Sequence, residues 1–275
     1  MKQTLTFILV LFSLNLTIAQ SSIEKDYAPI VAEGKLLYRS EMASWYGTDL
    51  FLEKYKNKED IGGYLSYSEN DISKCIFFNN DDHPKVIGTI SFNDSFDIKT
   101  AKVDLLPRNF SKKENDLYQI RKITLNELRT DSLFKFYENT NPNLIPLING
   151  REKKVYVLTG PKQSGVVIFG NDYLVTFDEN NKITAKKQLH KNILPIAYGN
   201  DEEGRKIEGS MHSHLPETGD FITATDICTL MLYGKIAKWK THNVVSQKYL
   251  NTWNCETETL NVIPLETVKK INEKE

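Results

Sequence analysis

Apolar and polar positions in the first half of the chain predict two helices with a small group of strands between them. Residues 35–56 carry apolar side chains at helical spacing, among them Leu37, Trp45 and Leu52. A second helix is predicted over residues 114–129. Between the helices lie three short β-rich runs, separated by Asn and Asp turns: 62–67, 75–78 and 86–90. This half is therefore expected to be an α+β region containing a meander.

The second half of the chain adds further strands and one more helix. A helix is predicted over residues 223–238, shortly after the segment 209–214. Residues 171–178 and 182–185 predict a hairpin, because the Asn pair between them tolerates the dihedral angles of a tight turn. The other predicted strands are 154–158, 165–170, 243–246 and 249–253.

Turn-forming residues concentrate between the two halves. Asn and Pro dominate residues 139–143, and Asn149-Gly150 follows, which predicts a boundary near 139–150. The chain is accordingly divided into three parts after its N-terminal segment: an α+β domain of unknown role over 20–145, a second domain over 150–265 and a solvated charged tail over 266–275.

The N-terminal segment is typical of a signal peptide. Lys2 precedes an apolar run from Leu5 to Ile18, and Ala19 supplies the small residue that a signal peptidase requires. We expect cleavage after residue 19 and export to a periplasm or out of the cell, with no stable membrane insertion afterwards. A retained N-terminal anchor is the alternative interpretation.

Charge and cysteine content narrow the function classes. The 275-residue chain has a formal net charge of −1 with both signs interspersed, which gives no footprint for nucleic acid or anionic membranes. Its three cysteines are too few for a disulfide scaffold, although a bridge between Cys228 and Cys255 is left open. Nothing in the sequence indicates an oligomeric state.

The strongest chemical signal is the sequence His212-Ser213-His214, followed by Asp226. Two imidazoles at positions i and i+2 of an extended segment point to the same side, with Cα atoms roughly 6.6 Å apart, so both reach one metal ion. The Asp is expected in the first turn of the following helix. Two His and one carboxylate, with a fourth position for water, is the composition of a catalytic zinc site.

A second interpretation of the same residues involves no metal. Thr223 followed three residues later by Asp226 is also a capping box at the start of a helix. The His pair would then be the polar face of a half-buried strand. Capping and ligation are compatible, because a carboxylate at this position does either. His190 and His242 have two interpretations, as partners behind the metal ligands or as surface residues, and the second is favoured.

The pattern His-Ser-His, a short Pro-containing connection, Thr223 and Asp226 resembles the signature of the JAB (JAMM, MPN-type) zinc metalloproteases. The resemblance covers about residues 150–265 and implies a cytidine-deaminase-like α/β fold with a mixed sheet. It implies Zn²⁺ held by His212, His214 and Asp226, with Thr223 in place of a Ser that helps stabilise the oxyanion. It also implies cleavage of an amide or isopeptide bond in a peptide or protein. The connection after His214 is one residue longer than in the family.

The chain departs from the family at the general base. The family places a Glu shortly before its first strand, where it takes a proton from the zinc-bound water, whereas residues 161–164 here contain no acid. Glu217, in the loop after His214, is the first candidate to replace it. Asp220, Glu152 and Glu179 are weaker candidates.

Two functions from different classes follow from this reasoning. The first is an exported zinc metallopeptidase in which a metal-activated water attacks the substrate. The second keeps the JAB-like domain as a catalytically degenerate module for binding or scaffolding, because the Glu is missing.

Overall fold

The structure is a computed structural model that describes residues 2–273, with side chains described for residues 23–270 and for Glu273. The predicted signal peptide, residues 1–19, lies outside the residues whose side chains are described, so export stays a prediction. A search of the described helices finds none with a segment long and apolar enough to cross a bilayer. The described chain is a mixed α/β molecule with four α-helices and several sheets.

The first half begins with a long helix and a four-stranded antiparallel meander. The predicted helix at 35–56 is the C-terminal part of α1 (Lys2–Lys54), and a short 3-10 helix, η1 (Lys58–Asp60), follows. The meander has the strand order β1-β2-β3-β4 and confirms the three predicted strands. Its bounds are β1 (Ile61–Glu69), β2 (Ile72–Asn79), β3 (Val86–Phe92) and β4 (Lys102–Asp104), and the predicted second helix follows as α2 (Lys112–Thr130).

A second antiparallel sheet occupies the middle of the chain, with the order β5-β6-β8-β9. The predicted hairpin is confirmed as the β8–β9 pair. Between β6 and β8 the chain leaves this sheet to form β7, which pairs with β10 alone. The strands are β5 (Thr140–Asn149), β6 (Glu152–Pro161), β7 (Val166–Gly170), β8 (Tyr173–Phe177), β9 (Ile183–Gln188) and β10 (Ile193–Ala197).

The last sheet is mixed and has the order β11-β12-β13-β14. Its first two strands are parallel and the others antiparallel. A parallel pair needs a crossover connection, and α3 supplies it between β11 and β12. α3 is the helix predicted over residues 223–238. The elements are β11 (Gly209–Ser213), α3 (Ala224–Ala237), β12 (Thr241–Val245), β13 (Tyr249–Asn254), β14 (Thr259–Pro264) and α4 (Leu265–Asn272). The predicted solvated tail begins as the helix α4, and its described side chains are exposed or half-buried.

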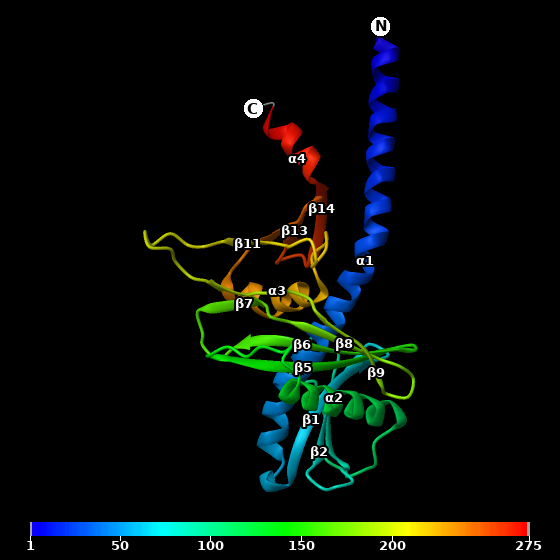
Figure 1. Ribbon diagram of the computed structural model, residues 1–275, viewed down its shortest axis with the longest axis vertical. Helices are drawn as coiled ribbons and strands as arrows, with labels where there is room; N and C mark the ends of the chain where they lie inside the picture. Colours follow the sequence, from blue (N-terminus) through cyan, green and yellow to red (C-terminus); the bar gives the residue numbers. More distant parts are fainter. Residues whose placement is uncertain (1, 274–275) are drawn as a thin grey trace.

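α1 packs against α3 and against the meander, while α2 lies on the β5–β6 pair (Figure 1). The two helices α1 and α3 approach closely at Gly34. A Cβ atom added at Gly34 would lie 2.7 Å from Cβ of Ile227 and 2.9 Å from the carbonyl oxygen of Ala224. This contact fixes the first turn of α3, which carries Asp226.

The predicted turn-rich boundary at 139–150 is wrong at the level of secondary structure, because residues 140–149 form β5. Pro142 and Pro146 are accommodated because β5 is an edge strand, where a missing N–H leaves no ladder bond broken. Residues that precede β5 in the sequence and residues that follow it share one buried apolar cluster, among them Leu65, Leu117 and Val157. The two halves of the chain are therefore packed together at this strand.

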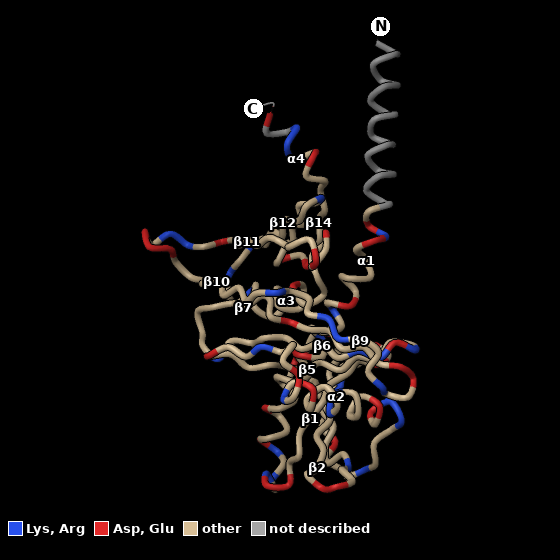
Figure 2. Tube along the Cα trace, in the orientation of Figure 1, with Lys and Arg blue, Asp and Glu red and all other residues tan. Residues whose placement is uncertain are grey.

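Among the described residues the cysteines form no disulfide, and the charged residues are not segregated by sign. All three cysteines are buried and free, so the Cys228–Cys255 bridge is not formed. Acidic and basic residues are intermixed along the described part of the trace (Figure 2).

Glu114 lies in the first turn of α2 and is 1 % exposed. Its carboxylate accepts two hydrogen bonds of 2.7 Å from the Arg108 guanidinium, one of 2.7 Å from the Ser111 backbone N–H and one of 2.9 Å from the Tyr67 hydroxyl. Burial opposes ionisation, but these donors outweigh it and lower the pKa of Glu114 to about 2. Ser111 caps the helix in return.

This network predicts a loss of stability in acid. Because the folded-state pKa of Glu114 lies below its unfolded value, its contribution is present above pH 4.5 or so and is lost as the pH falls toward 2. We expect Glu114→Gln to reduce the free energy of unfolding at pH 7 by about 3 kcal/mol and to flatten its dependence on pH in that interval. Urea titrations from pH 7 to pH 2 measure this. The exposed Glu138→Gln is the control, and an equal loss there would refute the assignment.

Candidate metal centre

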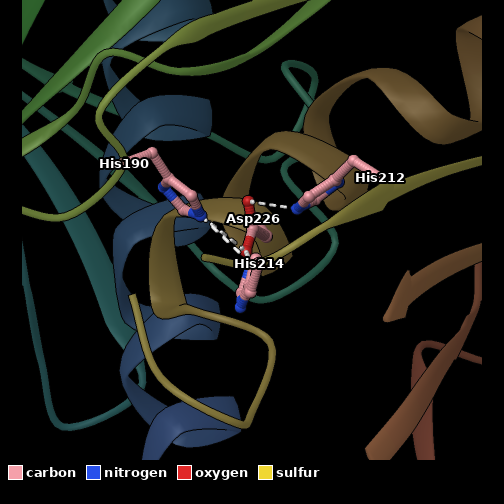
Figure 3. Close-up of side chains that lie close together, drawn as sticks. All are labelled: His190, His212, His214 and Asp226. Atoms are coloured by element: carbon pink, nitrogen blue, oxygen red, sulfur yellow. Dashed lines mark hydrogen bonds and ion pairs between the residues drawn. The ribbon is translucent and has the colours of Figure 1, made fainter. Parts of the chain in front are cut away.

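Four buried side chains from three parts of the chain point at one another (Figure 3). β11 carries His212, and His214 follows one residue after the strand ends. Asp226 lies in the first turn of α3, and His190 comes from the connection after β9. One potential ligand atom from each of the four lies within 4.8 Å of those of the other three. The structure therefore brings together the three predicted ligands and adds a fourth residue.

The predictions for His190 and His242 as surface residues are wrong. His190 is 5 % exposed and His242 is fully buried. His190 lies inside the cluster, whereas His242, on β12, lies behind His212 and stacks on the ring of Phe169.

Four separations between potential ligand atoms are close to those around a small cation, and all the atoms lie within 4.8 Å of one another. His214 Nε2 lies 3.1 Å from His190 Nε2 and 3.2 Å from Asp226 Oδ2, and His190 Nε2 lies 3.6 Å from the same oxygen. His212 Nε2 is 3.7 Å from Asp226 Oδ1. Ligands at 2.0–2.1 Å from a tetrahedral zinc lie roughly 3.3 Å apart. The four residues are therefore close enough to bind a metal ion.

Hydrogen bonds behind the rings orient them. His190 Nδ1 lies 2.8 Å from Asp172 Oδ1. His212 Nδ1 lies 2.9 Å from His242 Nε2, whose ring is in turn 2.7 Å from the Ser210 hydroxyl. When His212 donates to His242, and His242 to Ser210, the Nε2 lone pair of His212 is free for a cation. Such partners behind metal-bound imidazoles fix the tautomer and the ring orientation.

Electrostatics at the cluster favour a positive charge. Burial disfavours a charged His190, but the carboxylates of Asp226 and Asp172 outweigh burial and raise its pKa to about 9. Burial lowers the pKa of His212 to about 4, which keeps that imidazole neutral. Burial opposes ionisation of Asp226, yet the surrounding imidazoles hold its pKa well below the usual range.

Two buried ring nitrogens of the cluster, His212 Nε2 and His214 Nδ1, lack a hydrogen-bond partner among the described residues. His212 Nε2 is inaccessible to solvent and unpaired, although it faces Asp226. An unsatisfied buried polar atom costs about 1–3 kcal/mol. A metal ion bound at Nε2 would remove this cost, so the residues present fit a metal.

Thr223 and Asp226 form the predicted capping box, which is confirmed. The Thr223 hydroxyl accepts from the Asp226 N–H at 3.1 Å and lies 2.7 Å from Asp226 Oδ2, to which it donates. The Thr223 N–H donates to the same oxygen at 2.9 Å. The hydroxyl proton expected to stabilise an oxyanion is therefore already engaged with the carboxylate.

Two members of the cluster also line a groove on the surface. His190 and His212 both line this groove, whose volume is about 330 Å³. Its wall also includes two exposed apolar side chains, Met211 and Leu215, and reaches Thr218. Two members of the cluster are thus next to a surface groove with exposed apolar side chains.

The acids proposed as general base lie outside the cluster. Glu217 is exposed in the loop between Leu215 and Thr218, both of which line the groove. Asp220 pairs with Lys248 at 2.8 Å, and Glu152 pairs with Lys154 at 3.0 Å. None of the hydrogen bonds or ion pairs among the described residues joins these acids, or Glu179, to the four clustered side chains.

Sequence reasoning missed Asp172 as well as His190. Asp172 is 3 % exposed and lies between β7 and β8, far from the His-Ser-His segment in the sequence. No local spacing connects it to the other residues of the site.

Similarity to known proteins was tested in three ways. Comparisons of the chain with family models, with curated proteins and with solved structures found no match.

Proposed function

We propose that this chain is an exported, JAB-like zinc hydrolase that cuts an amide or isopeptide bond in a peptide or protein. The observation that carries the proposal is the convergence of three imidazole Nε2 atoms on the Asp226 carboxylate beside an open groove. The resemblance of the metal motif to the JAB signature supports the reaction type.

Zinc is proposed because of the donor set. Imidazole nitrogens and a carboxylate oxygen suit Zn²⁺, whereas Mg²⁺ and Ca²⁺ prefer sites made of oxygen ligands. When bound, Zn²⁺ lowers the pKa of a coordinated water and polarises a substrate carbonyl.

The chain's own residues would orient the substrate and move the proton. Met211 and Leu215 offer apolar contacts along the groove. Glu217 follows Leu215 by two residues in the same loop, and its carboxylate is proposed to accept the proton of the attacking water. Glu217 holds no described ion pair that would have to break first.

A second function is favoured by His190. Zinc sites with four protein ligands are typically structural, whereas catalytic sites keep one position open. If His190 binds permanently, the domain is a metal-stabilised module whose groove binds a peptide without cutting it.

Activity with and without metal distinguishes the two functions. We expect the purified protein, with its native metal content, to cleave members of a peptide and isopeptide library. Cleavage should stop after dialysis against EDTA and return when zinc is added. A zinc-loaded protein that binds peptides but cuts none would contradict the hydrolase and support the module.

Glu217→Gln tests the proposed proton acceptor. The amide orients water but accepts no proton, so kcat/KM should fall about 100-fold while the zinc content stays the same. Steady-state assays with the best library peptide measure the effect, and Glu138→Gln is the matched control. Unchanged kcat/KM in Glu217→Gln would exclude Glu217 as the base.

A further inference from the structure

The Asp172 carboxylate is buried and contacts both His190 and the first turn of α3. Its Oδ1 accepts from the His190 backbone N–H at 3.1 Å and contacts His190 Nδ1 at 2.8 Å. Its Oδ2 accepts from the Thr225 hydroxyl in the first turn of α3. We propose that Asp172 is a positioning residue that holds His190 as the fourth ligand of the metal centre. This inference rests on the metal binding in the proposed function, and His190 as a permanent fourth ligand favours the metal-stabilised module over the hydrolase.

The chain around Asp172 is held in place by its neighbours. The side chain of Asn171 donates to the Lys135 carbonyl at 3.0 Å and accepts from the Tyr173 hydroxyl at 2.7 Å. Asn171 has a φ of +49°, and Gly170 before it has a φ of +75°. A Cβ atom at Gly170 would lie 2.1 Å from the Asn192 carbonyl oxygen, so the two loops are in direct contact.

The hydrogen bond to Asp172 determines which nitrogen of His190 faces the cluster. An ionised carboxylate only accepts hydrogen bonds, so His190 Nδ1 must carry the proton. The lone pair of a neutral His190 is then on Nε2, which points at His214 and Asp226. This is the arrangement of a carboxylate–histidine–zinc triad.

The distances place His190 Nε2 at ligand spacing from two of the other three donor residues. Its Nε2 lies 3.1 Å from His214 Nε2 and 3.6 Å from Asp226 Oδ2. Two ligands of one tetrahedral zinc lie roughly 3.3 Å apart, which these values bracket. A base that takes a proton from a coordinated water would lie one further hydrogen bond away from the metal. His190 therefore occupies the fourth ligand position.

Asp172 also connects the segment after β9 with the first turn of α3, independently of any metal ion. Through His190 it fixes the connection after β9, and through Thr225 it contacts the helix turn that carries Asp226. The contact with Thr225 offers a matched control, because Thr225→Val removes it while leaving the bond to His190 in place.

Titration with Co²⁺ of the metal-free, full-length protein tests the inference, because the visible absorption of Co²⁺ reports the number of ligands. We expect the wild type to give the intense spectrum of a four-coordinate ion. Asp172→Asn should weaken Co²⁺ affinity 10–100-fold. His190→Ala should change the spectrum to the weaker one of a higher-coordinate ion with added water. Thr225→Val should keep the wild-type affinity and spectrum.

Each result has a definite meaning. A wild-type affinity and spectrum in either Asp172→Asn or His190→Ala would overturn the inference but leave the proposed function intact. The same is true if Thr225→Val weakens binding as much as Asp172→Asn, because Asp172 would then act through α3. A wild type that binds neither Co²⁺ nor Zn²⁺ would overturn the inference and the proposed function together. Circular dichroism of each variant establishes that it is folded.

Discussion

Replacing both His212 and His214 with alanine is expected to abolish metal binding. The purified wild type should contain stoichiometric zinc, and the double variant should contain none. The reason is geometric, because these residues supply two of the four converging donor atoms and both are more than nine-tenths buried. A remaining pair, His190 and Asp226, would leave half of the ion's coordination to water.

The loss should also appear in stability. A ligand that binds only the folded state stabilises it by about 4 kcal/mol when its concentration is 1,000 times the Kd. Added zinc should therefore raise the Tm of the wild type by several degrees and leave that of the double variant unchanged. Metal analysis and thermal unfolding with and without zinc measure both effects.

His83→Ala is the matched control, because His83 is exposed in a turn outside the cluster. Equal zinc content in the wild type and in the double variant would show that the ion binds elsewhere. The metal centre and the hydrolase would then both be abandoned.

The three predicted ligands could be identified from the sequence because they lie close together along the chain. His212 and His214 are two residues apart on an extended segment, so the strand period alone places both rings on one side. Asp226 follows as the third residue of a helix whose start Thr223 marks. Strand and helix periods describe such short distances well.

His190 and Asp172 illustrate the opposite case. They reach the cluster through a loop-to-loop contact and through packing between a strand connection and α3, over separations of 24 residues from His190 to His214 and 53 from Asp172 to Thr225. Nothing in the local sequence around His190 marks it as buried, since it follows charged residues of β9. Only the tertiary arrangement makes it part of the site.

In the fold, too, elements with local periodicity were predictable, whereas those that depend on long-range pairing were not. The β8–β9 hairpin and α3 were predicted close to their observed bounds, whereas the helix predicted from residue 35 begins at Lys2. β5 was missed because Asn and Pro residues dominate its first half, and these are typical of turns. Its position at the edge of a sheet, which tolerates Pro142 and Pro146, follows from long-range pairing alone.

Substitutions at Asp226 and at Thr223 are expected to distinguish metal binding from helix capping. Asp226 Oδ2 accepts the cap hydrogen bonds from Thr223 and also lies 3.2 Å from His214 Nε2, so one carboxylate has two tasks. Asp226→Asn keeps an oxygen that accepts from the Thr223 N–H but loses the negative charge. Thr223→Ala removes the capping hydroxyl and leaves the charge.

We expect the two variants to fail in different ways. Asp226→Asn should weaken zinc binding by at least about 3 kcal/mol, or about 100-fold in Kd, because a buried charge loses its compensating partner. Thr223→Ala should lower the free energy of unfolding of the metal-free protein by about 1 kcal/mol and keep stoichiometric zinc. Zinc titration with a competing chelator and urea unfolding measure the two quantities. If Asp226→Asn bound zinc as tightly as the wild type and only destabilised α3, Asp226 would be a helix cap alone. The proposed metal centre would then consist of the three imidazoles without an anionic ligand.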